Sequence, residues 1–204
     1  MSAQIWDLTV RSAAVAALEA SYCDRPKFLA LCTQCPNYGN NWACPPSEAA
    51  MEACLAGRGH AYLLGLRMHH DEATRARYAE DPDGAKTFIR ALYADYKGRF
   101  LRMLYTMEDR FPGSYGVSAG ACSLCDACTR PDGLPCRRPD RTRHSFEGFG
   151  FDVTALARDL LDTRLLWVQS GLPAYHTLIN ALFVPAADPA IEAAVRAACE
   201  AALV

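Results

Sequence analysis

Seven of the ten cysteines in this chain of 204 residues lie in two short segments rich in glycine and proline, residues 32–46 and 122–139. Cysteines grouped in this way bind metals, carry out redox chemistry or form disulfides. Disulfides belong to oxidising compartments, and the chain begins without the basic patch and apolar run of a secretory signal. We therefore expect a cytoplasmic protein whose two cysteine segments bind metal.

The second segment, residues 122–139, has the more complete set of ligands. Its candidate metal ligands are Cys122, Cys125, Cys128 and Cys136. The first three follow the spacing Cys-x2-Cys-x2-Cys, with which bacterial ferredoxins present three ligands of an iron–sulfur cluster while a fourth cysteine comes from elsewhere. Structural zinc sites usually hold two Cys-x2-Cys pairs farther apart in sequence. The spacing therefore favours a 4Fe-4S cluster, with zinc as the alternative.

Basic residues accompany these cysteines: Arg130, Arg137, Arg138, Arg141, Arg143 and His144. One interpretation is a solvated surface that Asp132 and Asp140 help to balance. Another is that guanidinium groups, with Arg137 and Arg138 as cofactor-binding candidates, offset the negative charge of a thiolate-bound cluster and raise its reduction potential. A third is the docking of an anionic substrate or an acidic partner. The sequence leaves these three roles open.

The first segment, residues 32–46, offers three candidate ligands, Cys32, Cys35 and Cys44. A four-thiolate cluster here would need a further ligand from Cys23, Cys54 or another residue type such as His60. Otherwise one iron remains open to a substrate or small ligand, or Cys44 joins the ligands of the second segment. Tyr38 and Trp42 are candidates for shielding a cofactor from water, with ordinary packing as the alternative.

Helices and strands alternate around these segments. We expect helices over residues 10–22, 48–55, 86–110 and 153–162 and after Asp188, with Ser47, Asp152 and Asp188 as N-caps. We expect strands over residues 61–68, 115–119, 165–169 and 176–184. The last two are close enough in sequence to form a hairpin. The pattern predicts a single α+β domain (residues 1–204) with a mixed or antiparallel sheet of about four strands, packed helices and two cysteine-rich metal-binding loops.

Both segments also fit a longer pattern. The first reads Cys32-x2-Cys35-Pro-x-Tyr38-Gly39-x2-Trp42-x-Cys44-Pro45-Pro46. The second reads Cys122-x2-Cys125-x2-Cys128, then Pro135-Cys136-Arg137-x-Pro139, Ser145-x-Glu147 and Gly150-x-Asp152-Val153. This order resembles a family described as predicted metal-binding proteins (domain of unknown function 2284), although Arg143-His144-Ser145 stands where the family more often has Arg-Pro-Ser. The resemblance implies metal binding by the motif cysteines and implies no reaction.

Composition and missing motifs exclude several other functions. A net charge of −2 and a pI of about 6.2 favour neither nucleic acid nor membrane binding, and no apolar run approaches the length of a membrane span. The sequence has no phosphate-binding loop, dinucleotide fingerprint or H-E-x2-H zinc motif. It also lacks the Cys-x3-Cys-x2-Cys spacing of most radical S-adenosylmethionine enzymes.

Three hypotheses follow from the motifs. The first is a protein with one or two 4Fe-4S clusters that transfers electrons to a redox partner protein or matures a metalloenzyme client. The second is a cluster enzyme in which an open iron binds a small substrate as a Lewis acid. The third is a zinc-stabilised interaction module. The sequence specifies neither catalytic residues nor an oligomeric state.

Overall fold

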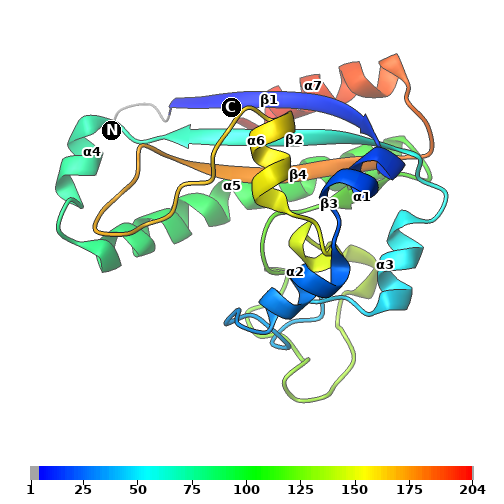
Figure 1. The fold of residues 1–204 in the computed structure, drawn as a ribbon, viewed down its shortest axis with the longest axis horizontal. Coiled ribbons are helices and arrows are strands. Elements are labelled where there is room, and N and C mark those ends of the chain that lie inside the picture. Colours follow the sequence, from blue (N-terminus) through cyan, green and yellow to red (C-terminus); the bar gives the residue numbers. More distant parts are fainter. Residues whose placement is uncertain (1–4, 204) are drawn as a thin grey trace.

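A four-stranded antiparallel sheet with the strand order β1-β2-β4-β3 lies at the centre of the computed structural model, which describes residues 5–203 (Figure 1). The strands are β1 (Ile5–Ala14), β2 (His60–His69), β3 (Tyr115–Val117) and β4 (Tyr175–Val184). The two central strands, β2 and β4, are apolar on both faces, so each face of the sheet must be covered. The predicted α+β class with about four strands is confirmed.

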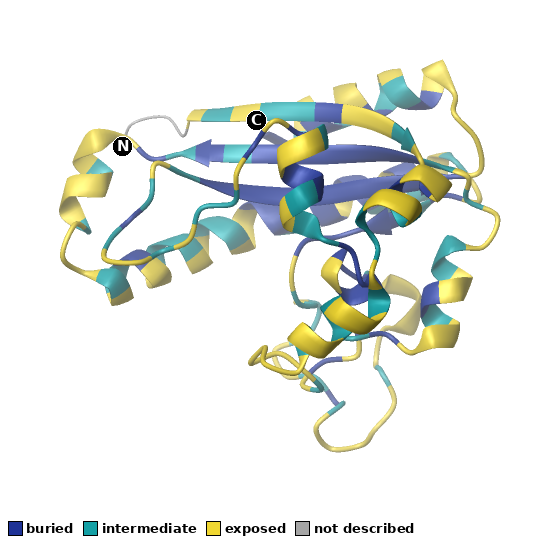
Figure 2. Ribbon diagram, in the orientation of Figure 1, coloured by how far each residue is buried: buried dark blue, intermediate teal, exposed yellow. Residues whose placement is uncertain are grey.

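Helices cover the two faces of this sheet. They are α1 (Val15–Tyr22), α2 (Arg25–Cys32), α3 (Glu48–Leu55), α4 (Glu72–Arg77), α5 (Pro82–Arg110), α6 (Val153–Leu160) and α7 (Pro189–Leu203), with the 3-10 turns η1 (Pro139–Arg141) and η2 (Glu147–Phe149). Leu64 and Leu66 of β2 face α5 and α7, whereas Leu63 faces α1, α6 and η2. Figure 2 shows the buried sheet between outer helix surfaces that are exposed. Among residues 5–203, no helix is both long and apolar enough to cross a lipid bilayer.

The predicted N-caps are confirmed. The Ser47 hydroxyl accepts a hydrogen bond from the Ala50 N–H at 3.2 Å, the Asp152 carboxylate accepts from Ala155 at 2.9 Å, and the Asp188 carboxylate accepts from Ala190 at 2.7 Å. Each satisfies a backbone donor that the first helical turn leaves unpaired. These caps fix where α3, α6 and α7 begin.

Two predicted elements are wrong. Residues 10–14 belong to strand β1, and the helix begins only at Val15. Apolar Trp6, Leu8 and Val10 alternate with polar residues, and this two-residue period pairs the segment with β2. Residues 165–169 form no strand, and Trp167 among them is 72% exposed. Strand β4 therefore pairs with β2 and β3 and not with a hairpin partner.

A buried segment, residues 144–152, connects the sheet to the cysteine loops. Phe146, Phe149 and Phe151 are almost fully buried beneath the sheet. The backbone of this segment also pairs with the chain that leads into α2: Asp24 N–H donates to the Gly150 carbonyl at 3.0 Å, and Asp152 N–H donates to the Tyr22 carbonyl at 2.7 Å. Gly150 has a φ of +84°, and a Cβ there would lie 2.7 Å from the Cα of Arg25. Only glycine permits this close approach of α2.

Candidate metal centre

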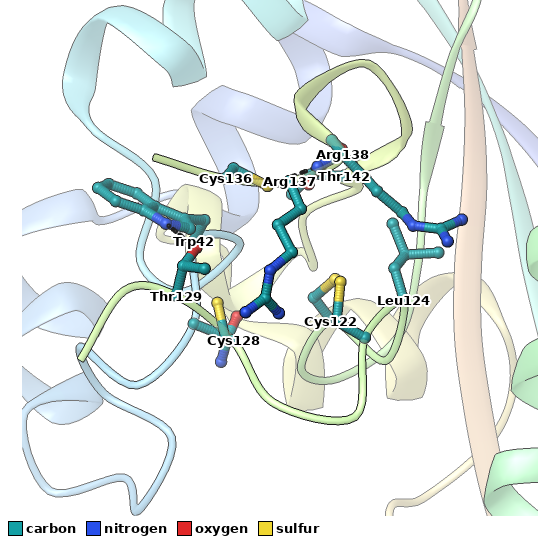
Figure 3. A pocket seen from close by; sticks show the side chains of 11 residues that line it. Trp42, Cys122, Leu124, Cys128, Thr129, Cys136, Arg137, Arg138 and Thr142 are labelled. Atoms are coloured by element: carbon teal, nitrogen blue, oxygen red, sulfur yellow. Dashed lines mark hydrogen bonds between the residues drawn. The ribbon is translucent and has the colours of Figure 1, made fainter. Parts of the chain in front are cut away.

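The second cysteine loop, residues 122–139, brings its four predicted ligands to one pocket. Cys122, Cys125, Cys128 and Cys136 all line one small pocket. Figure 3 shows the sulfur atoms of the labelled cysteines facing this space. Soft thiolates that surround one space are the donor set that iron–sulfur clusters and zinc both accept. The residues present therefore fit the group that the sequence motif predicts.

Backbone N–H groups of the same loop point at its sulfur atoms. The Arg138 N–H donates to the Cys136 sulfur at 3.4 Å, and the Leu124 N–H donates to the Cys122 sulfur. Burial raises the pKa of Cys122, with further increases from Cys136 and Cys125 and a decrease from the Leu124 hydrogen bond. Hydrogen bonds to ligand sulfurs stabilise the thiolate form and tune the reduction potential of a bound cluster.

The two arginines predicted to bind a cofactor differ in direction. The Arg137 side chain extends across the pocket between Cys122 and Cys128 (Figure 3), and its guanidinium donates to the Ala127 carbonyl at 2.8 Å. The Arg138 side chain runs toward Leu124 and away from the sulfur atoms. Of these two arginines, Arg137 is therefore the one whose positive charge faces the thiols.

The first cysteine loop, residues 32–46, gathers a separate group of three thiols. The Cys35 N–H donates to the Cys32 carbonyl at 2.9 Å, and the Gly39 N–H donates to the Cys44 carbonyl at 3.3 Å. Gly39 has a φ of +70°, which lets the chain turn back toward its start. Burial raises the pKa of Cys44 to about 11, with further contributions from Cys32 and Cys35. The three thiols are thus electrostatic neighbours.

The other residues considered as a fourth ligand lie among different neighbours. The Cys23 thiol donates to the Phe149 carbonyl at 3.7 Å, and the charges around it are those of Arg25, Glu19 and Asp24. The charges around Cys54 belong to Arg58, Arg143 and Glu108. The His60 ring packs against Tyr62 at the start of β2. The contacts of these three residues thus lie with other parts of the fold.

Two side chains join the loops to each other. The Arg130 guanidinium donates to three carbonyls of the first loop, those of Asn41, Cys44 and Pro45, at 2.7, 2.9 and 3.1 Å. It also lies over the Trp42 ring at 5.4 Å from the ring centre. The Trp42 indole N–H in turn donates to the Leu134 carbonyl of the second loop at 3.1 Å. Arg130 is therefore a bridge between the loops.

The two aromatic candidates of the first loop have different surroundings. Trp42 lines the pocket of the second loop, although its own segment carries the other three cysteines. Tyr38 is 44% exposed, so its ring presents a large surface to solvent. Trp42 is itself 37% exposed, and of the two rings it is the one that lines the second-loop pocket.

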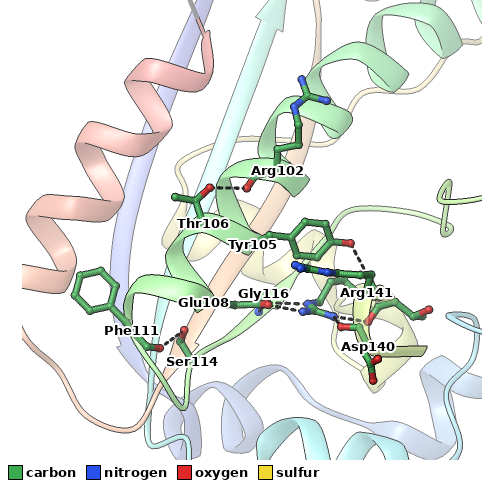
Figure 4. Close-up of polar contacts among 11 residues, drawn as sticks. Arg102, Tyr105, Thr106, Glu108, Phe111, Ser114, Gly116, Asp140 and Arg141 are labelled. Carbon is green, nitrogen blue, oxygen red and sulfur yellow. Dashed lines mark hydrogen bonds and ion pairs between the residues drawn. The ribbon is translucent and has the colours of Figure 1, made fainter. Parts of the chain in front are cut away.

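An ion pair anchors the chain that follows the second loop. Arg143 pairs with Glu108 of α5, and their side chains are only 9% and 12% exposed. Glu108 also accepts from the Gly116 N–H at 2.6 Å, and the Tyr105 hydroxyl donates to the Arg141 carbonyl at 2.5 Å (Figure 4). Arg143 thus neutralises Glu108, and its charge is not free to offset a cluster. A neighbouring contact, His144 Nδ1 to the Ala43 carbonyl at 2.9 Å, reaches the first loop.

Lys97 lies beside both cysteine loops, although no cysteine motif points to it. It lies on α5, is 8% exposed, and its ammonium group donates to the Ala121 carbonyl next to Cys122. Burial lowers the pKa of Lys97, and the charges of Cys122, Cys44 and Glu147 oppose that decrease. The signal in the sequence is a lysine on the apolar stripe Tyr93, Lys97, Leu101, Leu104. Its cation lies within electrostatic range of both loops.

Within residues 5–203, no three cysteine, histidine, aspartate or glutamate side chains already converge as the ligands of one metal ion. A 4Fe-4S cubane takes its thiolates at four separate irons, so its ligands need not meet at one point. All ten cysteines are free thiols, which leaves the seven motif cysteines available as donors.

The fold and these two loops define a cysteine-rich α+β protein with free thiols on two adjacent loops. Residues 19–179 match the model of a family described as "Predicted metal-binding protein (DUF2284)". The match covers most of the chain and both loops, so the protein belongs to this family, as its motifs predict. A search of curated proteins found no match, and neither did a search of solved structures.

Proposed function

We propose that this protein binds two 4Fe-4S clusters, one on each cysteine loop, and transfers electrons between them and a partner. The observation that carries the proposal is the pocket shared by Cys122, Cys125, Cys128 and Cys136, which supplies four thiols from one loop. When bound, such clusters supply one-electron oxidation and reduction. The partner would be a redox protein or a metalloenzyme that receives electrons during its maturation.

The closeness of the two loops supports a relay. Hydrogen bonds from Arg130 and Trp42 connect the two loops. The Lys97 ammonium interacts electrostatically with thiols of both loops, Cys122 and Cys44. A buried cation between two thiolate groups favours the reduced, more negative state of each cluster. The ten free thiols suit a reducing compartment, and we place the protein in the cytoplasm on this ground.

Metal analysis of protein purified without oxygen tests the proposal. We expect iron and acid-labile sulfide in equal amounts, with the broad visible absorption of thiolate-bound iron. A colourless protein with one or two zinc ions per chain would overturn it. Cys199→Ala is the control, because Cys199 is buried on α7 and its replacement should change packing but not metal content.

A second candidate function follows from the incomplete first loop. Cys32, Cys35 and Cys44 supply three thiols, and a cluster held by three thiolates keeps one iron for another ligand. Such an iron can bind a small substrate as a Lewis acid. Reduced-state EPR separates the two functions, because an added ligand shifts the spectrum only where an iron is accessible.

A further inference from the structure

We propose that the buried pair of His70 and His176 is a pH-sensitive switch. While the pair is neutral it holds α4 and residues 165–173 against the end of the sheet, and one added proton releases them. The pair lies where β2 ends and β4 begins, next to α4 and away from the cysteine loops (Figure 1). The inference therefore goes beyond the proposed function and does not depend on a bound cluster.

The two imidazole rings are hydrogen-bonded directly to each other. His70 Nε2 lies 2.9 Å from His176 Nδ1, and both residues are only 7% exposed. The other ring nitrogen of His70, Nδ1, is buried and has no hydrogen-bond partner among residues 5–203. One end of the pair is thus closed off without an acceptor.

Aromatic side chains of α5 and α4 cover the pair. The Phe88 ring packs edge-on against the His70 ring, with the ring centres 5.7 Å apart, and Tyr78 packs against Phe88 at 5.4 Å. The Tyr93 hydroxyl of α5 donates to the carbonyl of the residue after His176 at 3.4 Å. Burial raises the pKa of Tyr93, so this neighbour stays neutral. The covering layer therefore supplies no negative charge to the pair.

The geometry fixes where an added proton must go. A neutral pair carries two ring protons, one within the bond between the rings and one on an outer nitrogen, so His70 Nδ1 can remain bare. A cationic pair carries three ring protons, which occupy the bond and both outer nitrogens. His70 Nδ1 then becomes a buried N–H donor without an acceptor, and an unsatisfied buried group costs most when it is charged. The closed structure therefore resists protonation.

The charges around the pair act mainly in the same direction. Burial lowers the pKa of His70 to about 4, with smaller decreases from His69 and Arg75 and an increase from Asp71. Burial also lowers the pKa of His176 to about 4, and His70 adds to the decrease. An exposed imidazole has a pKa of about 6.5, so an open state binds the proton more readily. The pair therefore stabilises the closed state above about pH 6.5, and this stability is lost as the pH falls toward 4.

Little else holds the covering segments in place. Helix α4 has six residues, none of which is buried. Residues 165–173 line a groove with α4, and a Cβ at Gly171 would lie 2.8 Å from the Tyr78 carbonyl oxygen. The His70 N–H donates to the Ala174 carbonyl at 2.9 Å, which ties both segments to the histidine pair. Segments with few buried contacts open locally at low free energy.

Amide hydrogen exchange at pH 7.5 and pH 5 tests the switch in the anaerobically purified protein. In His70→Gln the side-chain amide can replace Nε2 in the bond and can accept from a protonated His176, and Nδ1 is gone. In His176→Asn the amide oxygen can still accept from His70, so an added proton must still occupy Nδ1. His69→Gln is the control, because it removes the partly exposed histidine next to the pair.

We expect the protection factors of residues 70–82 and 165–174 to fall by about tenfold or more between pH 7.5 and pH 5 in the unmodified protein. His176→Asn and His69→Gln should show the same fall, whereas His70→Gln should keep its protection. Exchange in residues 32–46 and 122–139 is read from the same data, so loss of a cluster in acid is seen separately.

Protection of residues 70–82 that is independent of pH would overturn the proposal, as would an equal fall in His70→Gln. Histidine ring ¹⁵N NMR of the unmodified protein keeps the test decisive if His70→Gln does not fold. The pair should then take up its proton together with the opening, and a pair that titrates near pH 6.5 with α4 still protected would refute the switch.

Discussion

The two cysteine loops are built differently. The second loop, residues 122–139, supplies four thiols to one pocket and sends backbone N–H groups to two of its sulfurs. The first loop, residues 32–46, supplies three thiols, of which Cys35 is exposed, and depends on other segments for its contacts. One loop carries four cysteines of its own, whereas the other carries three and is held by contacts from distant segments. This difference predicts unequal responses to the same kinds of substitution.

The largest expected effect comes from removing one thiol of each loop. If each loop holds its own cluster, Cys125→Ala and Cys35→Ala should each lose about half of the iron and sulfide, and the double variant should lose nearly all of it. Metal and sulfide analysis after anaerobic reconstitution measures this. Loss of all iron in either single variant would mean that the loops share one cluster, with Cys44 joining the second set.

The next effect tests what anchors the second loop. Glu108→Ala leaves the Arg143 guanidinium buried without its carboxylate, and breaking a buried ion pair in this way costs about 3–5 kcal/mol. Denaturant unfolding of the metal-free protein measures the loss. The matched control is Glu192→Ala, which breaks the exposed Glu192–Arg196 pair on α7 and should cost less than about 1 kcal/mol.

Glu108→Ala should also loosen both loops, because the first loop is bonded to the second. Amide hydrogen exchange should increase in residues 32–46 as well as in residues 122–139. Faster exchange confined to the second loop would show that the first loop is held independently, through α2 and η2.

A smaller effect tests whether the first loop depends on the second, by removing the hydrogen bonds that connect them. Arg130→Met keeps the aliphatic stem but removes three hydrogen bonds to first-loop carbonyls. We expect the free energy of unfolding to fall by about 2 kcal/mol, because hydrogen bonds from charged groups are stronger than neutral ones. We expect faster amide exchange in residues 32–46 and unchanged exchange around Cys136. Arg138→Met, whose exposed side chain runs away from the thiols, is the control. Equal loosening of both loops would contradict a one-way dependence.

The same contrast explains how far sequence reasoning reaches. The second set of cysteines was predictable because its ligands follow one another along a few turns. The apolar strands and the capped helices were predictable because their signals are local. The surroundings of the first loop were not, because Arg130, His144 and Glu147 reach it from about a hundred residues away. The prediction of a helix over residues 10–14, which belong to strand β1, was wrong for another reason. The apolar residues of the helix over 15–22 made the helical pattern start earlier in the sequence than the helix does.

Lys97 offers the smallest effect and the finest test of the comparison. Its ammonium lies near Cys122 and Cys44, so it should stabilise the reduced form of both proposed clusters. Lys97→Met should lower both midpoint potentials. The second-loop shift should be the larger, on the order of 60 mV, which is a tenfold change in a one-electron equilibrium, because Lys97 is bonded to the residue next to Cys122.

Redox titration followed by EPR measures both potentials, and Lys97→Arg, which keeps the charge, is the control. If neither potential moves, Lys97 is a structural residue only. A larger shift at the first loop would mean that the cation mainly serves the site with fewer thiolates. In that case the attraction between the Lys97 ammonium and the Glu147 carboxylate would explain why the ammonium acts more strongly on the first loop.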